Sequence, residues 1–403
     1  SRFLQIHTLT SYPSALLNRD DVGFAKRVSF GGATRTRISS QCLKRHWRTF
    51  EGENAIRDIA PPSVRSRASF ERFVYEPLVA SGVESAVADA ITEALIAEVL
   101  GESAKAKREK AEGKTKKGKK ENLSTDREPL STNQVTVLGR PELDFLAEEG
   151  RAIAKKCASS AVVPAAVKEH FTRELRENLR VMRMGAGLDA ALFGRMVTSD
   201  ILARGDAAIH VAHAFTTHAE EAESDYFSAV DDLLKERDGL GSGHIGSVEL
   251  TSGLYYGYVV VDVPLLVSNI EGGDRREWTS RDRALASEIV RRLVRLVATV
   301  SPGAKLGSTA PYAYAHMVLV EAGNAQPRTL ANAFVSPVRA NGDLIGNAYG
   351  AVAEYLRDLD SMYGAATQRR LSAVGPADRL AYLGAERGDL EATAAWAAEQ
   401  VRG

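Results

Sequence analysis

Residues 30–48 read FGGATRTRISSQCLKRHWR, and the order of residue types in this stretch suits the binding of a phosphate. Gly31 and Gly32 have no Cβ, so they adopt backbone angles that other residues avoid and allow a close approach of the main chain. Arg35 and Arg37 are two apart in an extended segment, so both guanidinium groups are expected on one side. The stretch therefore predicts a turn and a strand that together bind phosphate.

A short helix is predicted directly after that strand. Ser39 is typical of a helix N-cap, and the free amides and positive dipole end of a helix from there to about Phe50 favour an anion. Lys44, Arg45 and Arg48 follow at helical spacing, which puts Lys44 and Arg48 on one face. A solvated basic surface helix is the alternative interpretation of this pattern.

The distribution of charge favours the phosphate interpretation. Residues 1–50 contain nine Lys and Arg against two acids, a net charge of +7. The whole chain has 52 basic and 52 acidic residues and therefore no net formal charge. Positive charge is gathered near the N-terminus, as in a surface that binds nucleic acid.

A second basic tract covers residues 105–120, KAKREKAEGKTKKGKK. It has no apolar residue larger than alanine, so we expect a loop without a packed core. Its attraction to nucleic acid would be independent of sequence and would weaken with salt. A solubilising insertion is the alternative. The candidate DNA-binding residues are Lys105, Lys107, Lys110, Lys114, Lys116, Lys117, Lys119 and Lys120.

Length and cysteine content limit the class of protein. A chain of 403 residues is long enough for one large domain with insertions or for two domains. Cys42 and Cys157 provide neither a disulfide framework nor a metal-ligand spacing, which suits a reducing cytoplasm. No apolar run approaches ~18 residues, and no charged and apolar leader begins the chain, so we expect neither secretion nor a membrane partner.

Two groups of residues in the sequence are candidate metal ligands. Asp20 and Asp21 are adjacent acids in a predicted loop, and carboxylates bind Mg²⁺, although side chains in such loops more often cap turns. His210, His213 and His218 lack the glutamate of the zinc-binding H-E-x-x-H pattern, so we favour histidines that are satisfied near a turn. We therefore expect no metal and no cofactor.

Residues 219–238 carry eight acids against two basic residues, a net charge of −6. An acidic loop in a protein with a basic groove can contact another copy of the chain head to tail. An ordinary solvated loop is the alternative.

The remaining pattern mixes strands with helices. Tyr255, Tyr256 and Tyr258 lie in the strongest strand signal and are expected in the core rather than in base stacking. No dinucleotide-binding fingerprint occurs, which indicates an α+β sheet domain with long insertions. Strands are predicted over residues 2–10, 134–138, 247–263 and 313–321, and helices over residues 61–100, 142–157, 164–180, 279–299 and 344–360.

Seven motifs occur in a fixed order along the chain. They are L-N-R-D-D at residues 17–21, F-G-G-x-x-R-x-R-I-S-S-Q-x-L-K-R at 30–45, F-G-R-M at 193–196, V-A-H-A-x-T-T-H at 211–218, F-x-A-V-D-D at 227–232, S-G-x-x-Y at 252–256 and A-N-A-F at 331–334. Their order resembles that of the CasC family, the backbone subunit of the type I-E CRISPR surveillance complex Cascade.

The resemblance implies an α+β fold with an RRM-like (ferredoxin-like) palm, a helical finger insertion and a β-hairpin thumb. Several copies would polymerise head to tail along a CRISPR guide RNA and, with other Cascade subunits, present its bases to invading target DNA in antiviral defence. The implied divisions are palm at 1–57, 183–210 and 247–365, finger at 58–182, thumb at 211–246 and a C-terminal helical tail at 366–403.

The resemblance also implies a non-catalytic, cytoplasmic scaffold. Met196 would act as an apolar wedge against a displaced base. The alternative is a metal-dependent RNA-cleaving subunit that uses Asp20 and Asp21, as in type III effector complexes. The implied RNA-binding residues are Lys26, Gly31, Gly32, Arg35, Arg37, Ser39, Ser40, Gln41, Lys44, Arg45, Arg48 and Met196.

Overall fold

The computed structural model describes residues 1–101, 106–108, 129–181, 186–195, 205–230 and 242–403. The chain divides into two compact units. One contains Ser1–Ile59, Ile209–Pro264 and Asp282–Gly403, and the other contains Ala60–Ala208 and Leu265–Arg281. In the described part of the chain, no helix is both long enough and apolar enough to cross a membrane.

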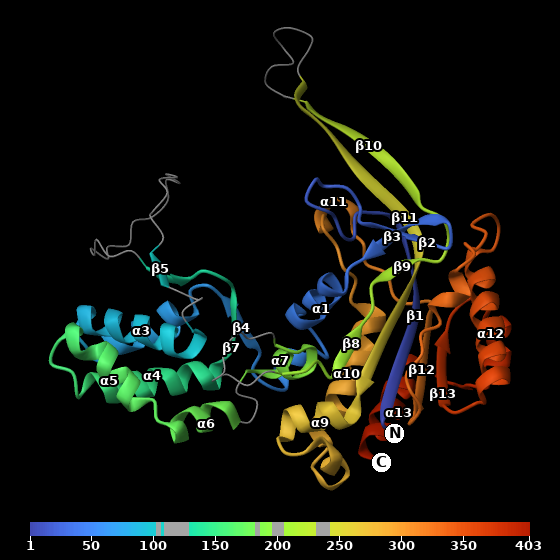
Figure 1. Cartoon of the computed structure of the whole chain (residues 1–403). Helices are drawn as coiled ribbons and strands as arrows, with labels where there is room; N and C mark the ends of the chain where they lie inside the picture. Colours follow the sequence, from blue (N-terminus) through green and yellow to red (C-terminus); the bar gives the residue numbers. More distant parts are fainter. Residues whose placement is uncertain (102–105, 109–128, 182–185, 196–204, 231–241) are drawn as a thin grey trace. The chain divides into compact units, whose positions relative to one another are not determined.

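The first unit is built on a ten-stranded sheet with the order β14-β13-β12-β1-β11-β9-β3-β2, and β8 and β10 also pair with β11 (Figure 1). The described pairs are antiparallel except β13 with β14, which is parallel. The strands are β1 Phe3–Ala15, β2 Arg27–Phe30, β3 Ala33–Ile38, β8 Ile209–Val211, β9 Ala214–Thr216, β10 Glu221–Val230, β11 Ser242–Asp262, β12 Met317–Gly323, β13 Gln368–Ala373 and β14 Glu386–Arg387.

Helices pack against both faces of this sheet. Side chains alternate along a strand, so Tyr256 packs in a core cluster with Tyr349 of α12, whereas Tyr255 packs in another cluster with Ile38. The expectation of a core position is confirmed for Tyr255 and Tyr256, whereas Tyr258 is partly buried and packs against the cluster that contains Tyr256. The helical segments of this unit are α1 Ser40–Thr49, η1 Ile56–Asp58, α10 Ala284–Thr299, α11 Leu306–Thr309, η6 Ala331–Phe334, α12 Leu344–Tyr363, η7 Ala377–Leu383 and α13 Leu390–Arg402.

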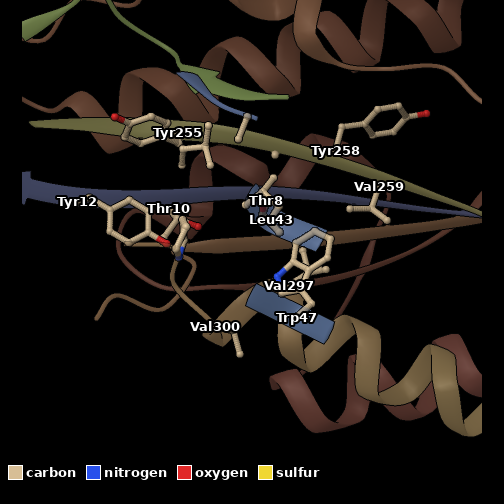
Figure 2. Close-up of a pocket in the computed structure, with 14 residues that line it drawn as sticks. Thr8, Thr10, Tyr12, Leu43, Trp47, Tyr255, Tyr258, Val259, Val297 and Val300 are labelled. Atoms are coloured by element: carbon tan, nitrogen blue, oxygen red, sulfur yellow. The ribbon is translucent and has the colours of Figure 1, made fainter. Parts of the chain in front are cut away.

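Trp47 attaches α1 to the sheet. Its side chain is 2% exposed and lines a pocket of about 40 Å³ together with Thr10 and Tyr12 of β1 (Figure 2). Burial of this large aromatic side chain holds the helix against the sheet. The helix expected after the strand is therefore present, and its position is set by a core contact.

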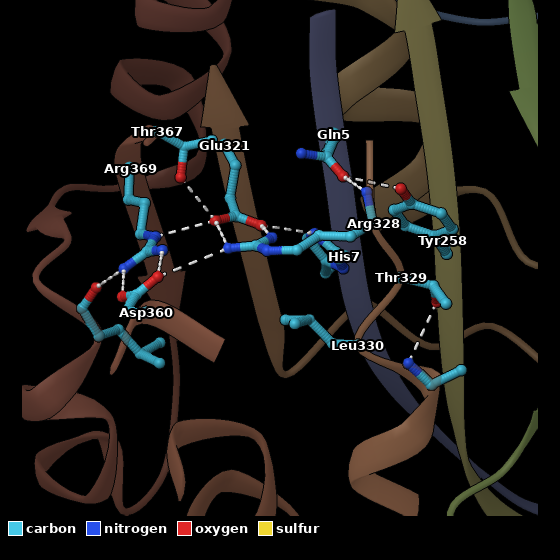
Figure 3. Close-up of polar contacts among 12 residues, drawn as sticks. Gln5, His7, Tyr258, Glu321, Arg328, Thr329, Leu330, Asp360, Thr367 and Arg369 are labelled. Atoms are coloured by element: carbon cyan, nitrogen blue, oxygen red, sulfur yellow. Dashed lines mark hydrogen bonds and ion pairs between the residues drawn. The ribbon is translucent and has the colours of Figure 1, made fainter. Parts of the chain in front are cut away.

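A buried ionic network joins β1, β12 and β13 (Figure 3). The carboxylate of Glu321 is fully buried and accepts hydrogen bonds from Arg369 at 2.8 Å and from Arg328 at 2.7 Å. His7 lies 3.2 Å from the same carboxylate. Burial by itself would raise the pKa of Glu321, but the hydrogen bonds and charges of His7 and Arg328 hold it well below its ordinary value.

This network corrects the prediction for residues 366–403. That segment is not a wholly helical tail, because β13 adds a strand to the sheet beside β12 and brings Arg369 to Glu321. The Ala-rich composition predicts helix locally, yet the partner strand and the buried ion pair decide the structure of residues 368–373.

The second unit is mainly helical. Val87, Ile91, Leu95 and Val99 of α3 are buried, as their four-residue spacing predicts. Its segments are β4 Ser63–Ser66, η2 Glu71–Tyr75, α2 Glu76–Ala80, α3 Ser85–Leu100, β5 Ala106–Arg108, β6 Leu130–Thr132, β7 Thr136–Gly139, α4 Arg140–Ala154, η4 Ser160–Val162, α5 Val163–His170, α6 Arg173–Val181, α7 Leu188–Phe193, α9 Val263–Glu271, which begins in the first unit, and η5 Arg275–Ser280.

Two helix predictions in this unit are wrong in part. Residues 63–66 form β4 rather than helix, because they pair with β7. The helix expected over 164–180 is interrupted, since Thr172 caps a new helix by accepting a hydrogen bond from the Leu175 amide at 3.3 Å. Long-range pairing and a side-chain cap override the local helical pattern in these places.

Candidate nucleic-acid interface

The Gly-Gly turn joins β2 to β3 with positive φ angles of 61° at Gly31 and 76° at Gly32. A Cβ on Gly31 would lie 1.5 Å from the carbonyl oxygen of Val335, whereas a Cβ on Gly32 would meet no atom within 4 Å. The close main-chain approach predicted for Gly31 is therefore an approach to another segment of the protein. Gly32 is open on that side.

Arg35 is a correction to the predicted site. Its side chain is completely buried, and its guanidinium group donates to the carbonyl oxygens of Thr216 and Phe334, each at 2.9 Å. Because its side chain is covered and its two terminal nitrogens donate to these carbonyl groups, Arg35 does not form the second of two exposed donor forks. Arg35 and Arg37 alternate along β3 as predicted, but the local sequence carries no signal that Arg35 is covered.

Arg37 lies on the same face of the hairpin and remains half-exposed. It donates to the carbonyl oxygen of Arg27 at 3.0 Å and to Nδ1 of His213 at 2.9 Å. Burial, followed by the charges of Arg37 and Lys26, lowers the pKa of His213. Lys26, Arg37 and His213 therefore form one electrostatic group.

The N-terminus of α1 lies next to this group, since β3 ends at Ile38 and Ser39 is the N-cap. The Ser39 hydroxyl accepts a hydrogen bond from the Cys42 amide at 3.3 Å, and the predicted cap is confirmed. Ser40 is buried, whereas Gln41 is exposed. The positive end of the helix dipole thus adds to the charge around Lys26 and Arg37.

Lys26 also connects the group to α1. Burial raises the pKa of the Cys42 thiol, while Lys26 and Arg45 act in the opposite direction, so both cations lie within electrostatic reach of Cys42. Arg45 is exposed. Lys44 and Arg48 are half-buried and already have interaction partners.

The cations of this region differ in their pairing. Arg27 donates to Glu220 at 2.6 Å and also pairs with Glu249, so its charge is balanced. Among the described residues, no carboxylate lies within ion-pair distance of Lys26, Arg37 or Arg45. We call Lys26, Arg37, Arg45 and His213 the cationic cluster.

Some predicted residues fall outside the described part of the chain. Met196 is one of them, as are seven of the eight candidate DNA-binding lysines: Lys105, Lys110, Lys114, Lys116, Lys117, Lys119 and Lys120. Lys107 lies on β5.

The acidic loop at residues 20 and 21 has a structural explanation. Oδ1 of Asp20 accepts hydrogen bonds from the amides of Val22, Gly23 and Phe24 at 2.7 to 3.0 Å. Desolvation would raise the pKa of Asp20, but the three amide donors, together with the charge of Arg27, lower it overall. The interpretation of Asp20 as a turn cap is confirmed.

The histidines likewise have structural partners. The imidazole of His218 is buried, with Nε2 accepting from the Leu254 amide at 3.2 Å and Nδ1 lying 2.7 Å from the carbonyl oxygen of Ala219. No group of three or more His, Cys, Asp or Glu side chains that could hold a metal ion occurs among the described residues.

His213 is the residue that sequence reasoning missed. The sequence predicts either a metal ligand or, preferably, a histidine that is satisfied near a turn, whereas the structure joins His213, directly before β9, to Arg37 of β3. Phe30 and Phe215, whose rings lie beside Arg37, were also not identified as site residues. The motif V-A-H-A-x-T-T-H contains both His213 and Phe215, but the pairing of Arg37 with Phe215 is a property of the sheet.

The chain is similar to solved subunits of RNA-guided complexes. One chain of a structure titled "CRISPR RNA-guided surveillance complex, pre-nicking" is 28% identical, with a TM-score of 0.75, over 98% of this chain and 100% of that chain. A chain of a "CRISPR RNA-guided surveillance complex" is 24% identical, with a TM-score of 0.65, over 98% of this chain and 99% of that one, and shows a shared fold.

Among curated proteins, no relative of this chain was found by sequence. The family model described as CT1975-like protein, Cas_CT1975, matches residues 4–396, and the resemblance to the CasC family is confirmed. The chain belongs to the CT1975-like protein family.

Proposed function

We propose that this protein is a guide-RNA-binding backbone subunit of a type I-E Cascade complex. The observation that carries the proposal is the cationic cluster at the N-terminus of α1, in which three cations have no described carboxylate partner. A cation whose charge is not balanced by a carboxylate remains available for a phosphate oxygen. The solved chain with 28% identity belongs to a complex that its title describes as RNA-guided, which supports RNA as the ligand.

The cluster suits recognition of the RNA backbone rather than of base edges. Lys26 and Arg45 supply positive charge, and Arg37 supplies a planar donor group. Contacts to phosphates position a strand without reading its sequence. Watson–Crick edges would remain free to pair with target DNA, which is what a guide requires.

Several copies would assemble head to tail along one RNA. Glu221, Glu223 and Asp225 alternate along β10, are exposed and share one face of the hairpin that β10 forms with β11 (Figure 1). Such an acidic stripe is complementary to a basic surface on a neighbouring copy. We propose that this hairpin is the thumb and that the sheet of the first unit contains the RRM-like palm.

We propose a non-catalytic role, in a reducing cytoplasm where the two free cysteines, Cys42 and Cys157, form no disulfide. The use of Asp20 as a turn cap argues against its use in RNA cleavage. Incubation of the assembled complex with complementary RNA and Mg²⁺ tests this point. Regularly spaced cuts that disappear in Asp20→Ala would overturn the scaffold proposal.

The RNA-binding proposal is tested by filter binding over a series of salt concentrations. Lys26→Ala and Arg45→Ala should each weaken binding to unrelated RNA sequences equally and reduce the salt slope by ~0.7 per lost phosphate contact. Arg357→Ala is the charge-matched control, because Arg357 is exposed on α12. A loss confined to one RNA sequence, or an equal loss in the control, would contradict the proposal.

A further inference from the structure

An apolar hollow adjoins the cationic cluster. It has a volume of about 310 Å³ and is lined by Val28, Phe30, Arg37, His213 and Phe215. Val28 and Phe30 come from β2, Arg37 from β3 and Phe215 from β9, where it is paired with Arg37. Alternation along these strands puts the side chains on one face of the sheet, at its β2 edge.

The two phenylalanines form an aromatic wall. Their ring centroids are 5.2 Å apart, and the ring planes meet at 67°, an edge-to-face arrangement. Both side chains are half-buried, and Val28 at the rim is 38% exposed. The apolar side chains of the hollow are therefore accessible rather than sealed in the core.

The charge around the hollow indicates what occupies it. Arg37 lines the wall, and His213 accepts its hydrogen bond through Nδ1 when the ring is neutral. Lys26 acts on His213 electrostatically. An apolar peptide side chain would gain nothing from these charges. A nucleotide offers both a flat apolar ring for the aromatic wall and a phosphate for the cations.

We propose that this hollow receives one base of a single-stranded RNA while the adjoining phosphate contacts Lys26 and Arg37. The inference rests on the proposed function and adds a base subsite to it. Recognition would tolerate all four bases, because each of them has a π-face that stacks on an aromatic ring. The hollow therefore adds affinity without selecting a sequence.

Binding to an ordinary single-stranded RNA and to an abasic RNA of the same length tests the proposal. Phe30→Leu keeps an apolar side chain and removes the ring, so it should lose roughly fivefold or more in affinity for the ordinary RNA. Its affinity for the abasic RNA should not change. Lys26→Ala is the matched comparison and should weaken binding to both RNAs. Unchanged affinity of Phe30→Leu for ordinary RNA, or an equal loss on both RNAs, would overturn the inference.

A second measurement does not depend on a variant that must fold. The unmodified chain is bound to RNA that contains 5-iodouridine, irradiated, and digested for mass spectrometry. Cross-links at Phe30 or Phe215 support the inference. Cross-links only at other residues would show that the hollow is unoccupied or is filled by a side chain of a second copy. If the unmodified chain binds neither RNA, the proposed function itself is wrong, and the inference of a base subsite is then wrong as well.

Discussion

The guanidinium group of Arg35 donates a hydrogen bond to the carbonyl oxygen of Phe334 at 2.9 Å, although the two residues are 299 positions apart in the chain. The same group donates to Thr216 of β9. Arg35 therefore ties β3 to β9 and to η6, and so holds the strand that carries Arg37. Its contribution to the site is structural.

Arg35→Ala and Arg37→Ala should separate folding from binding. Arg35→Ala removes buried bonds of a charged group, so we expect a loss of about 2–4 kcal/mol in the free energy of unfolding. Arg37→Ala should change stability by less than about 1 kcal/mol and weaken RNA binding. Urea denaturation and filter binding measure the two effects. Equal stability of the two variants would contradict the supporting role of Arg35.

The glycine turn gives a second pair of variants. Gly31→Ala and Gly32→Ala both place a Cβ at positive φ, which costs about 1–2 kcal/mol. Gly31→Ala should cost clearly more, because its Cβ also collides with the carbonyl oxygen of Val335. Thermal unfolding of the two variants shows which of them is less stable. If the turn did not pack against Val335, Gly31→Ala would be no less stable than Gly32→Ala.

His213 should make RNA binding depend on pH. Burial and the charges of Arg37 and Lys26 lower its pKa in the free protein from the ordinary value of 6.5. A bound phosphate favours the protonated ring and raises that pKa, so RNA binding takes up a proton. Affinity should therefore rise as pH falls from the raised pKa of the bound state toward the lowered pKa of the free protein.

The matched variants for this experiment are His213→Gln and His210→Gln, measured between pH 7.5 and 5.5. The pH-dependent gain in affinity should shrink in His213→Gln and persist in His210→Gln, since the exposed His210 lies on β8, outside the cationic cluster. An unchanged pH profile in His213→Gln would show that no phosphate lies beside this ring.

Glu321→Gln should destabilise the first unit at neutral pH. The carboxylate is fully buried between Arg369 and Arg328, and removal of its charge leaves these partners uncompensated, at a cost of about 3 kcal/mol. The pKa of Glu321 is lowered on folding. The ionised carboxylate therefore adds to the free energy of unfolding above the ordinary carboxyl pKa, and this stabilisation is lost progressively as pH falls below that value.

Unfolding measured from pH 7 to pH 3 checks this prediction. The difference in the free energy of unfolding between the natural protein and Glu321→Gln should become smaller as the pH approaches 3. Glu354→Gln on α12 is the control, because the Glu354 side chain is 72% exposed, and it should change stability little at any pH. A constant difference between the two proteins over this range would contradict the ionised state of Glu321.

Local patterns in the sequence predicted much of the framework. The cap at Ser39, the helix that follows it, the buried stripe of α3 and the strand containing Tyr255 all arise from residues close together in the chain. The predictions for residues 63–66 and 368–373 failed because each segment pairs with a strand distant in sequence. Such pairing leaves a weak local signal.

The sequence by itself determined the family, the concentration of positive charge in residues 1–50 and the positions of the turn and helix that could bind phosphate. Only the tertiary structure decided which cations stay accessible and without a described carboxylate partner. Arg35 is covered by carbonyl groups of β9 and η6, Arg27 is paired with Glu220 and Glu249, and His213 is brought to Arg37. Residue type sets the charge, but burial and ion pairing depend on which distant segments meet in the folded chain.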